Sequence, residues 1–261
     1  MALVFAAVLP HSPLLMPNIG KDNLSLFAST LKATKIVAEK IALIKPDIIL
    51  IISHDQEIKN SAFAINISPD FISDLSAFGD FVTRVHYTGE LALAYRCREQ
   101  LEAMSPLHLI TNENLNYTAS IALSLAGVNE KNPILPLYTS NADIKTHYAL
   151  GRQLQDCILS SEKKVVIIAS ADLSHRLNKK SPAGYLAKAK KLDQKIINCL
   201  TNDKIKELLA ISKISLDEAL IEDFEVIATL TGLLKGFNWP GQLLSYESPF
   251  GIGHPVIYWE A

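Results

Sequence analysis

Long hydrophobic runs and an excess of either charge are both missing from this chain of 261 residues. Its longest apolar runs, such as residues 48–52 and 165–169, have the length of a strand and fall far short of the ~20 residues that a membrane helix needs. Lysine and arginine number 25 against 27 aspartates and glutamates, which gives a net charge of −2. We therefore expect no membrane partner and no nucleic acid, because neutralising phosphates needs a basic face.

Cysteine is scarce as well. The chain has three, Cys97, Cys157 and Cys199, which lie far apart and form no CxxC pair. An odd number at such spacing indicates neither a disulfide framework nor a zinc knuckle. We expect three reduced thiols and a cytoplasmic location. The apolar N-terminal residues follow no lysine or arginine and are interrupted by Pro10, so a secretory signal is not expected either.

Apolar residues, by contrast, are plentiful. They make up 49% of the chain, charged residues make up 20%, and the mean hydropathy is +0.18. This composition supports a sizeable core and excludes disorder as the global state. Neither an internal repeat nor a low-complexity linker divides the sequence. We therefore expect a single domain over residues 1–261, which is large but within reach of one α/β fold.

Short apolar strands alternate with helical patterns along the chain. Apolar, often β-branched runs predict strands at residues 3–9, 47–53, 62–67, 81–87, 133–138, 163–170, 242–248 and 252–259. Apolar residues at helical spacing predict helices at residues 23–44, 90–104, 116–126, 144–159, 185–200 and 215–235. This alternation predicts an α/β fold with a central, mostly parallel sheet flanked by helices.

Histidines follow three of the predicted buried strands. His11 follows the first strand, His54 the second, and His175 lies a few residues after the strand at 163–170. In an open α/β sheet the ligand crevice lies beyond the carboxyl ends of the strands, so we expect these imidazoles to share one cleft. A single histidine after a strand is more often a turn or core residue, and it is the repetition that favours a site. His254, between the last two strands, could also approach this crevice.

A carboxylate would complete a metal site, since two histidines and one carboxylate are a ligand set of non-haem Fe(II). Ser215 and Glu218 have the spacing of a capping box at the start of the last predicted helix. Glu218, Glu222 and Glu225 then follow at intervals of four and three residues and form one acidic stripe. Acidic residues near a helix start more often favour the helix dipole and face water.

Four stretches of the sequence carry a resemblance to a known family: LVFAAVLPHSPLLMPNIGKDN, KPDIILIIS, VVIIASADLSHRL and LLSYESPFGIGHPV. In this order they resemble the LigB-like superfamily of class III extradiol ring-cleavage dioxygenases, and within it the branch called AmmeMemoRadiSam system protein B, relatives of Memo. Pro-His-Ser-Pro and Asp-Leu-Ser-His are the most specific parts. The resemblance covers most of the chain and implies an α/β sandwich around a central sheet.

The resemblance also implies an iron site. Enzymes of the superfamily hold Fe(II) with two histidines and a glutamate, and the matching residues here are His11, His54 and Glu222. The identity of the carboxylate ligand stays open, and the alternatives to Glu222 are Glu218, Glu225 and Asp55.

A further histidine acts as acid/base catalyst in these enzymes, and His175 matches it. The implied reaction is the extradiol opening of a catechol-type aromatic diol with O2, so the implied partners are a small aromatic substrate and dioxygen. The oligomeric state stays open, a homo-oligomer included.

Two departures from the family pattern favour a different class of protein. Relatives read Ser-Pro-His-Gly where this chain has Ser53-His54-Asp55-Gln56, and Asp-His-Gly where it has Asn116-Tyr117-Thr118. The alternative is a Memo-like metal-binding or non-catalytic scaffold protein whose degenerate site holds another divalent metal or none. A hydrolase that uses Ser12 or Ser174 is a weaker alternative, because neither serine lies in a Gly-x-Ser-x-Gly elbow.

Overall fold

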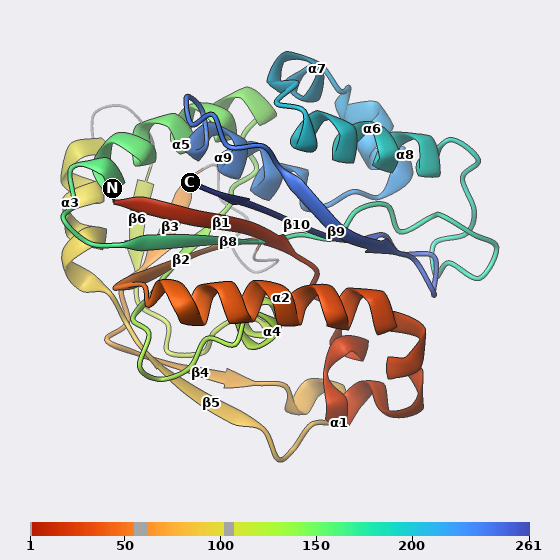
Figure 1. The fold of residues 1–261 in the computed structure, drawn as a ribbon, viewed down its shortest axis with the longest axis horizontal. Coiled ribbons are helices and arrows are strands. Elements are labelled where there is room, and N and C mark those ends of the chain that lie inside the picture. Colours follow the sequence, from red (N-terminus) through yellow and green to blue (C-terminus); the bar gives the residue numbers. More distant parts are fainter. Residues whose placement is uncertain (1, 55–61, 102–106) are drawn as a thin grey trace.

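A sheet of eight strands forms the centre of the computed structural model, which describes residues 2–54, 62–101 and 107–261 (Figure 1). In chain order its strands are β1 (Leu3–Leu9), β2 (Ile48–Ser53), β3 (Phe63–Asn66), β6 (Leu107–Ile110), β7 (Ile134–Tyr138), β8 (Val165–Ser170), β9 (Gln242–Glu247) and β10 (His254–Glu260). In space they follow the order β6-β3-β7-β2-β8-β1-β10-β9.

The four central strands β7, β2, β8 and β1 are parallel. Antiparallel pairs occur toward the two ends of the sheet, where β10 joins β1 and β9, and where β3 joins β7. Every residue of β2, β7 and β8 is buried, which explains their continuous apolar sequences. The structure therefore confirms the predicted α/β fold with a mostly parallel sheet.

Helices cover both faces of the sheet (Figure 1). One face carries α2 (Ala28–Ile44) and α4 (Tyr117–Leu125), with the short α1 (Pro17–Gly20) beside them. The other face carries α3 (Leu91–Leu101), α5 (Ile144–Leu159), α6 (Ala189–Thr201), α7 (Ile205–Leu209), α8 (Lys213–Ala219) and α9 (Phe224–Leu233). Each face has its own apolar core. No helix in the described part of the chain is long and apolar enough to cross a membrane.

The helices α5 and α9 are in direct backbone contact at two glycines. A Cβ on Gly151 would collide with the carbonyl oxygen of Thr229, and one on Gly232 would collide with that of Tyr148. A side chain at either position would force the helices apart. This close approach fixes the C-terminal half of α9 against α5.

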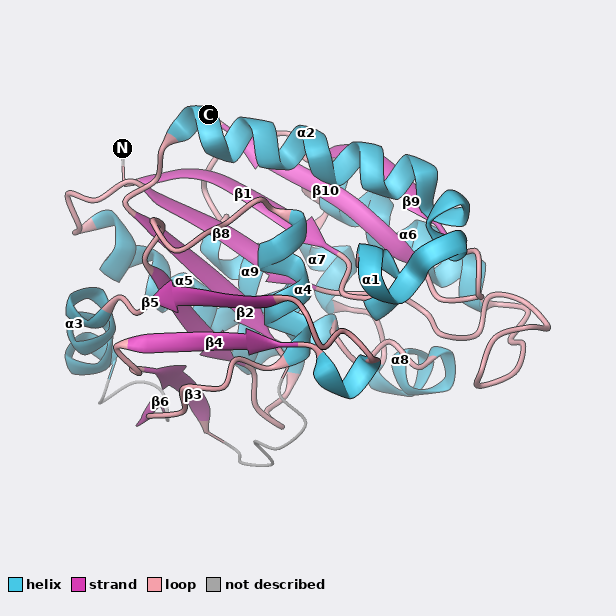
Figure 2. Ribbon diagram, turned by 90° about the horizontal axis from the view of Figure 1, so that it is seen from below, coloured by secondary structure: helices cyan, strands magenta, loops and turns pink. Residues whose placement is uncertain are grey.

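A small second sheet was only half predicted. Figure 2 shows it outside the main sheet, where β4 (Asp70–Asp74) pairs antiparallel with β5 (Arg84–Thr88). We expected a strand at residues 81–87 but none at β4. Buried and partly exposed positions alternate along β4 and both of its ends are aspartates, so it lacks the continuous apolar run of the central strands.

The predicted helix at residues 215–235 is wrong in its middle. α8 ends where Leu220 adopts a left-handed conformation with φ of 51°, and α9 starts only four residues later. The predicted capping box is wrong too, because Ser212 caps α8 by accepting the N–H of Ser215. The break divides the acidic stripe and leaves Glu222 in the connection between the two helices.

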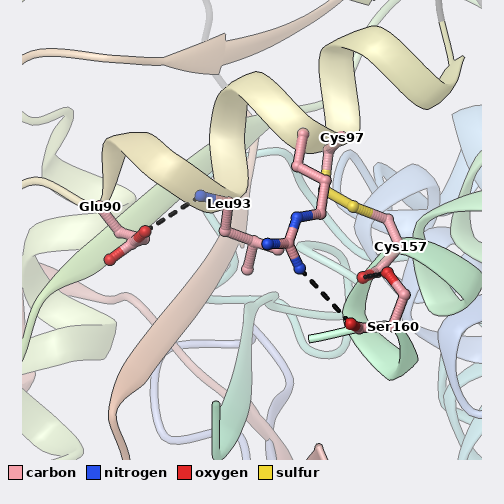
Figure 3. Close-up of a disulfide and its surroundings, with 6 residues drawn as sticks. Glu90, Leu93, Cys97, Cys157 and Ser160 are labelled. Atoms are coloured by element: carbon pink, nitrogen blue, oxygen red, sulfur yellow. Dashed lines mark hydrogen bonds between the residues drawn. A yellow bond between two sulfur atoms is a disulfide. The ribbon is translucent and has the colours of Figure 1, made fainter. Parts of the chain in front are cut away.

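The expectation of three reduced thiols is also wrong. Cys97 of α3 and Cys157 of α5 form a disulfide, and their Cα atoms are 5.6 Å apart (Figure 3). Next to it, Arg96 donates a hydrogen bond to the carbonyl of Ser160 at 3.4 Å. Cys199 is the remaining free thiol and is buried. The pairing joins two helices of one layer, at positions 60 residues apart in sequence.

Candidate active site

The carboxyl ends of three adjacent parallel strands, β2, β8 and β1, meet at one edge of the sheet. His11 follows β1 after a single residue, His54 directly follows β2, and residues 171–175 continue from β8. The structure thus places the three predicted histidines at the same edge. Two buried carboxylates, Asp172 and Asp223, lie among them.

The hydrogen bonds of His11 decide which of its ring nitrogens faces the site. Its Nδ1 lies 3.1 Å from Oγ of Ser170, whose hydroxyl donates to the carbonyl of Thr118 at 2.8 Å. Because the Ser170 proton points to Thr118, we assign the proton of the neutral ring to Nδ1, which donates to Ser170. Nε2 then carries a lone pair. Metal-binding histidines have this arrangement, with the second ring N–H held by the protein.

Two carboxylate oxygens face that lone pair. Nε2 of His11 lies 3.7 Å from Oδ2 of Asp172 and 3.7 Å from Oδ2 of Asp223, both longer than a hydrogen bond. Nδ1 of His254 holds the other oxygen of Asp172 at 2.8 Å, and the backbone N–H of Asp172 donates to Asp223 at 3.0 Å. Buried negative charges that converge in this way need a cation or a proton between them.

The two carboxylates differ in how well they are compensated. Burial acts to raise the pKa of Asp172, but the positive charge that His254 and His11 carry when protonated, with the hydrogen bond from His254, outweighs it and lowers that pKa to about 2. The pKa of Asp223 is raised, because burial and the nearby charge of Asp172 outweigh the positive charge that His11 and His54 carry when protonated. Asp223 is therefore the carboxylate that would gain most from a bound cation.

His54 and His175 reach the edge from loops whose backbones are fixed. The carbonyl of His54 accepts hydrogen bonds from Asn116 at 3.0 Å and from Thr118 at 3.2 Å, and its Nδ1 lies 3.3 Å from Oγ1 of Thr139. The N–H of His175 donates to the carbonyl of Ala219 at 3.2 Å. Each backbone is thus tied to a neighbouring element.

The predicted glutamates lie outside the buried group. Glu222 is exposed, Glu218 pairs with Lys188, and Glu225 pairs with Lys213 at 3.0 Å. Asp55, the other carboxylate we considered, lies outside the described residues. Glu222 is thus the predicted glutamate without an ion pair in the described part of the chain.

A cavity of about 1210 Å³ opens beside His54 and Glu222. Its wall is formed by the segment that leads into α5, by the end of α7, by α8, and by the connection between α8 and α9. Apolar side chains such as Ile144, Leu209 and Ile221 line it together with charged ones. It is large enough for a small organic ligand.

Four residues of this edge were missed as site residues, or only noted, in the sequence. Asp172 lies within the Asp-Leu-Ser-His motif but was read only as part of it. Asp223 was hidden because we extended one helix across it. His254 was noted and not assigned a role. Tyr117 stands where relatives carry the histidine of Asp-His-Gly, so its position in that motif was the available signal.

Tyr117 borders the buried group. Its ring meets that of His11 edge-on, with centroids 5.9 Å apart, and Phe78 packs on it at 5.0 Å. Burial raises the pKa of Tyr117, and the charges of Asp223 and Asp172 raise it further. The phenol is therefore neutral near pH 7.

These residues meet part of what a divalent metal requires. Within residues 2–54, 62–101 and 107–261, no group of three or more His, Cys, Asp or Glu side chains is spaced to hold an ion. The donor chemistry does fit Fe(II). Nε2 of His11 presents a lone pair, His54 is a second imidazole, and Asp223 is a poorly compensated buried carboxylate.

Comparison with known families identifies the chain. Residues 5–257 match the family described as the catalytic LigB subunit of aromatic ring-opening dioxygenase. The chain belongs to this LigB family. The match covers almost all of the main sheet and every residue of the buried group.

Two further proteins are similar to this chain over nearly its whole length. Protein CA_C1420 of Clostridium acetobutylicum is 25% identical over 280 residues, an alignment that covers 97% of this chain. The chain spans only 57% of that relative's length. A crystal structure of an uncharacterised protein, JW3007 of Escherichia coli K12, superimposes with a TM-score of 0.67 at 17% identity, covering 98% of this chain and 99% of the other. At that identity the likeness concerns the fold alone.

Proposed function

We propose that this LigB-family protein is a non-haem Fe(II)-dependent extradiol dioxygenase that opens a catechol-type aromatic diol with O2. The observation that carries the proposal is the lone pair of His11 Nε2, which faces two buried carboxylate oxygens at the carboxyl edge of the sheet. Bound Fe(II) would supply a Lewis acid for both diol oxygens and an open position for dioxygen. The buried carboxylates would gain the positive charge that they lack.

His11, His54 and Asp223 would hold the metal in this proposal. Asp223 takes the place that the family resemblance gives to Glu222, because Asp223 is buried and its Oδ2 lies 3.7 Å from the free nitrogen of His11. Glu222 is exposed on the cavity wall. It remains the alternative ligand, since a shift of one residue along the connection separates the two.

His175 would act as the acid/base group. It lies three residues after Asp172, and its side chain is only partly buried. An imidazole titrates near neutrality, so it can take a proton from a diol hydroxyl and return one later. The adjoining cavity would admit the aromatic ring next to His54.

Metal content is the first test. Wild-type protein is prepared without chelators, loaded anaerobically with Fe(II), and analysed for bound iron, followed by oxygen-electrode assays on a set of catechols. We expect about one iron per chain, lost in His11→Ala, whereas His86→Ala on an exposed position of β5 keeps it. Wild-type protein that holds no stoichiometric metal would exclude the dioxygenase.

A metal-binding or non-catalytic scaffold of the Memo type is the second candidate. It is favoured by the lack of a preformed three-residue metal group in the described ranges and by Tyr117 in place of the family's histidine. This candidate predicts bound metal, or none, together with no oxygen uptake on any catechol. Oxygen consumption coupled to ring opening would rule it out.

A further inference from the structure

A buried carboxylate on α6 has no part in the proposed chemistry. Asp193 is fully buried, and two groups hold its side chain. Oδ2 accepts a hydrogen bond from the hydroxyl of Tyr246 at 2.5 Å, and Oδ1 accepts one from the backbone N–H of Ser174 at 3.1 Å. Ser174 lies between the two site residues Asp172 and His175.

The segment around Ser174 is held from three directions. Its hydroxyl donates to the carbonyl of Ala219 at 2.7 Å, and its own carbonyl accepts the N–H of Gly253 at 3.0 Å. The N–H of Leu173 donates back to Gly253 at 2.8 Å. Asp193 supplies the third attachment, to the Ser174 N–H. The peptide that carries Asp172 on one side and His175 on the other therefore has one fixed orientation.

The fit around Asp193 is tight. A Cβ on Gly253 would lie 2.5 Å from Oδ2 of Asp193 and 3.0 Å from the hydroxyl of Tyr246. Any larger residue at position 253 would displace this pair. The glycine, the carboxylate and the phenol thus form one unit beneath the site.

We propose that Asp193, held by Tyr246, is a positioning residue that fixes the Ser174 peptide and thereby orients His175 and Asp172. The consequence for catalysis rests on the proposed function, but the orientation itself does not.

The cost of keeping a carboxylate at this place supports the proposal. Burial raises the pKa of Asp193 to about 6, although hydrogen bonds from Tyr246 and Ser174 act against the rise. The pKa of Tyr246 is raised as well, so its hydroxyl stays protonated and donates. An apolar side chain would fill the same space without the desolvation cost, but it could not accept the Ser174 N–H.

The test compares Asp193→Ala, Tyr246→Phe and Asp193→Asn with a matched control, Gln155→Ala. Gln155 is also buried and donates two hydrogen bonds, to the carbonyls of Leu233 and Lys235 at the end of α9. The readout is the imidazole NMR signal of His175 in metal-free protein, assigned with His175→Asn. It needs neither iron nor a substrate, so it stands even if the protein proves not to be a dioxygenase.

We expect Asp193→Ala and Tyr246→Phe to move the His175 signal, Gln155→Ala to leave it in place, and Asp193→Asn to restore it, because an amide oxygen still accepts the Ser174 N–H. With a substrate in hand, kcat of Asp193→Ala should fall by about 100-fold at unchanged iron content, the usual effect of a misplaced catalytic group. If Asp193→Ala does not fold, Tyr246→Phe decides alone. An unmoved His175 signal in the variants that fold, or an equal shift in Gln155→Ala, would overturn the proposal.

Discussion

The two sides of the candidate site differ in how their charges are satisfied. We call His11, Asp172, Asp223 and His254 the buried cluster, and we call His54, Glu222, Lys213 and Glu225 the cavity wall. In the buried cluster every side chain is almost fully removed from water, and two carboxylates face one free imidazole nitrogen. On the cavity wall the charges lie near water, and Lys213 already pairs with Glu225.

This difference indicates that the two sides have separate roles. Electrostatic attraction between exposed groups is weak, whereas a buried charge without a partner is costly and is maintained only where something compensates it. The buried cluster therefore has the stronger demand for a cation. The cavity wall has the room and the mixed polarity that suit a substrate. The predictions below change one side at a time and are ordered by the size of the expected effect.

Replacing His175 should have the largest effect. If His175 moves protons and does not bind metal, His175→Ala should keep its iron and still bind a catechol, while the ring-opening rate falls by roughly 10²–10⁴-fold. Iron analysis and oxygen-electrode kinetics measure the two quantities. Loss of iron in His175→Ala would place this residue among the ligands and put the weakly matched His54 outside them.

Replacing the carboxylate ligand should have the second-largest effect. Asp223→Asn should weaken iron binding by more than about 100-fold, beyond what loss of an outer partner causes, because it removes the only anionic ligand proposed. Glu222→Gln changes the neighbouring residue by the same chemistry and should leave iron affinity almost unchanged. Competition with a chromogenic chelator measures both. The reverse result would return the ligand role to Glu222.

Removing the Ser170 hydroxyl, which fixes the ring of His11, should have a smaller effect on iron binding. Ser170→Ala removes the acceptor of the Nδ1 proton, so the ring is free to change its tautomer and orientation. We expect iron affinity to fall by roughly 10- to 100-fold, as for other partners of metal-bound histidines. Ser53→Ala is the matched control, because Ser53 is a buried serine at the end of β2 whose hydroxyl bonds to Asn116. Equal losses in both variants would show a general defect at the sheet edge.

The sequence predicts the central strands and the histidines at their ends. The central strands are buried on both faces, so their continuous apolar runs identify them without tertiary information. The histidines at their ends are then placed by the topology of a parallel sheet. His11, His54 and His175 could be assigned to the edge for this reason, because each follows one of these strands.

Other features depend on contacts that no local pattern encodes. Apolar spacing continues across Leu220, so nothing in the periodicity indicates that the chain turns there and directs Asp223 inward. The Cys97–Cys157 pair is created only when α3 and α5 pack side by side. The hydrogen bond from Ser170 to Thr118, which sets the tautomer of His11, likewise joins two segments that are distant in sequence.

Breaking the disulfide should affect the site least. Cys97 and Cys157 close a loop of 60 residues, and such a cross-link restricts the unfolded chain by about 4 kcal/mol in the chain-entropy account. Cys97→Ser should therefore lower the free energy of unfolding in urea by up to that amount, while iron affinity stays unchanged, because neither cysteine touches the buried cluster or the cavity wall. Cys199→Ser controls for the loss of a buried sulfur. If wild-type protein shows free thiols at both positions under non-reducing conditions, the bond does not form in solution, and Cys97→Ser should then lose no more stability than Cys199→Ser.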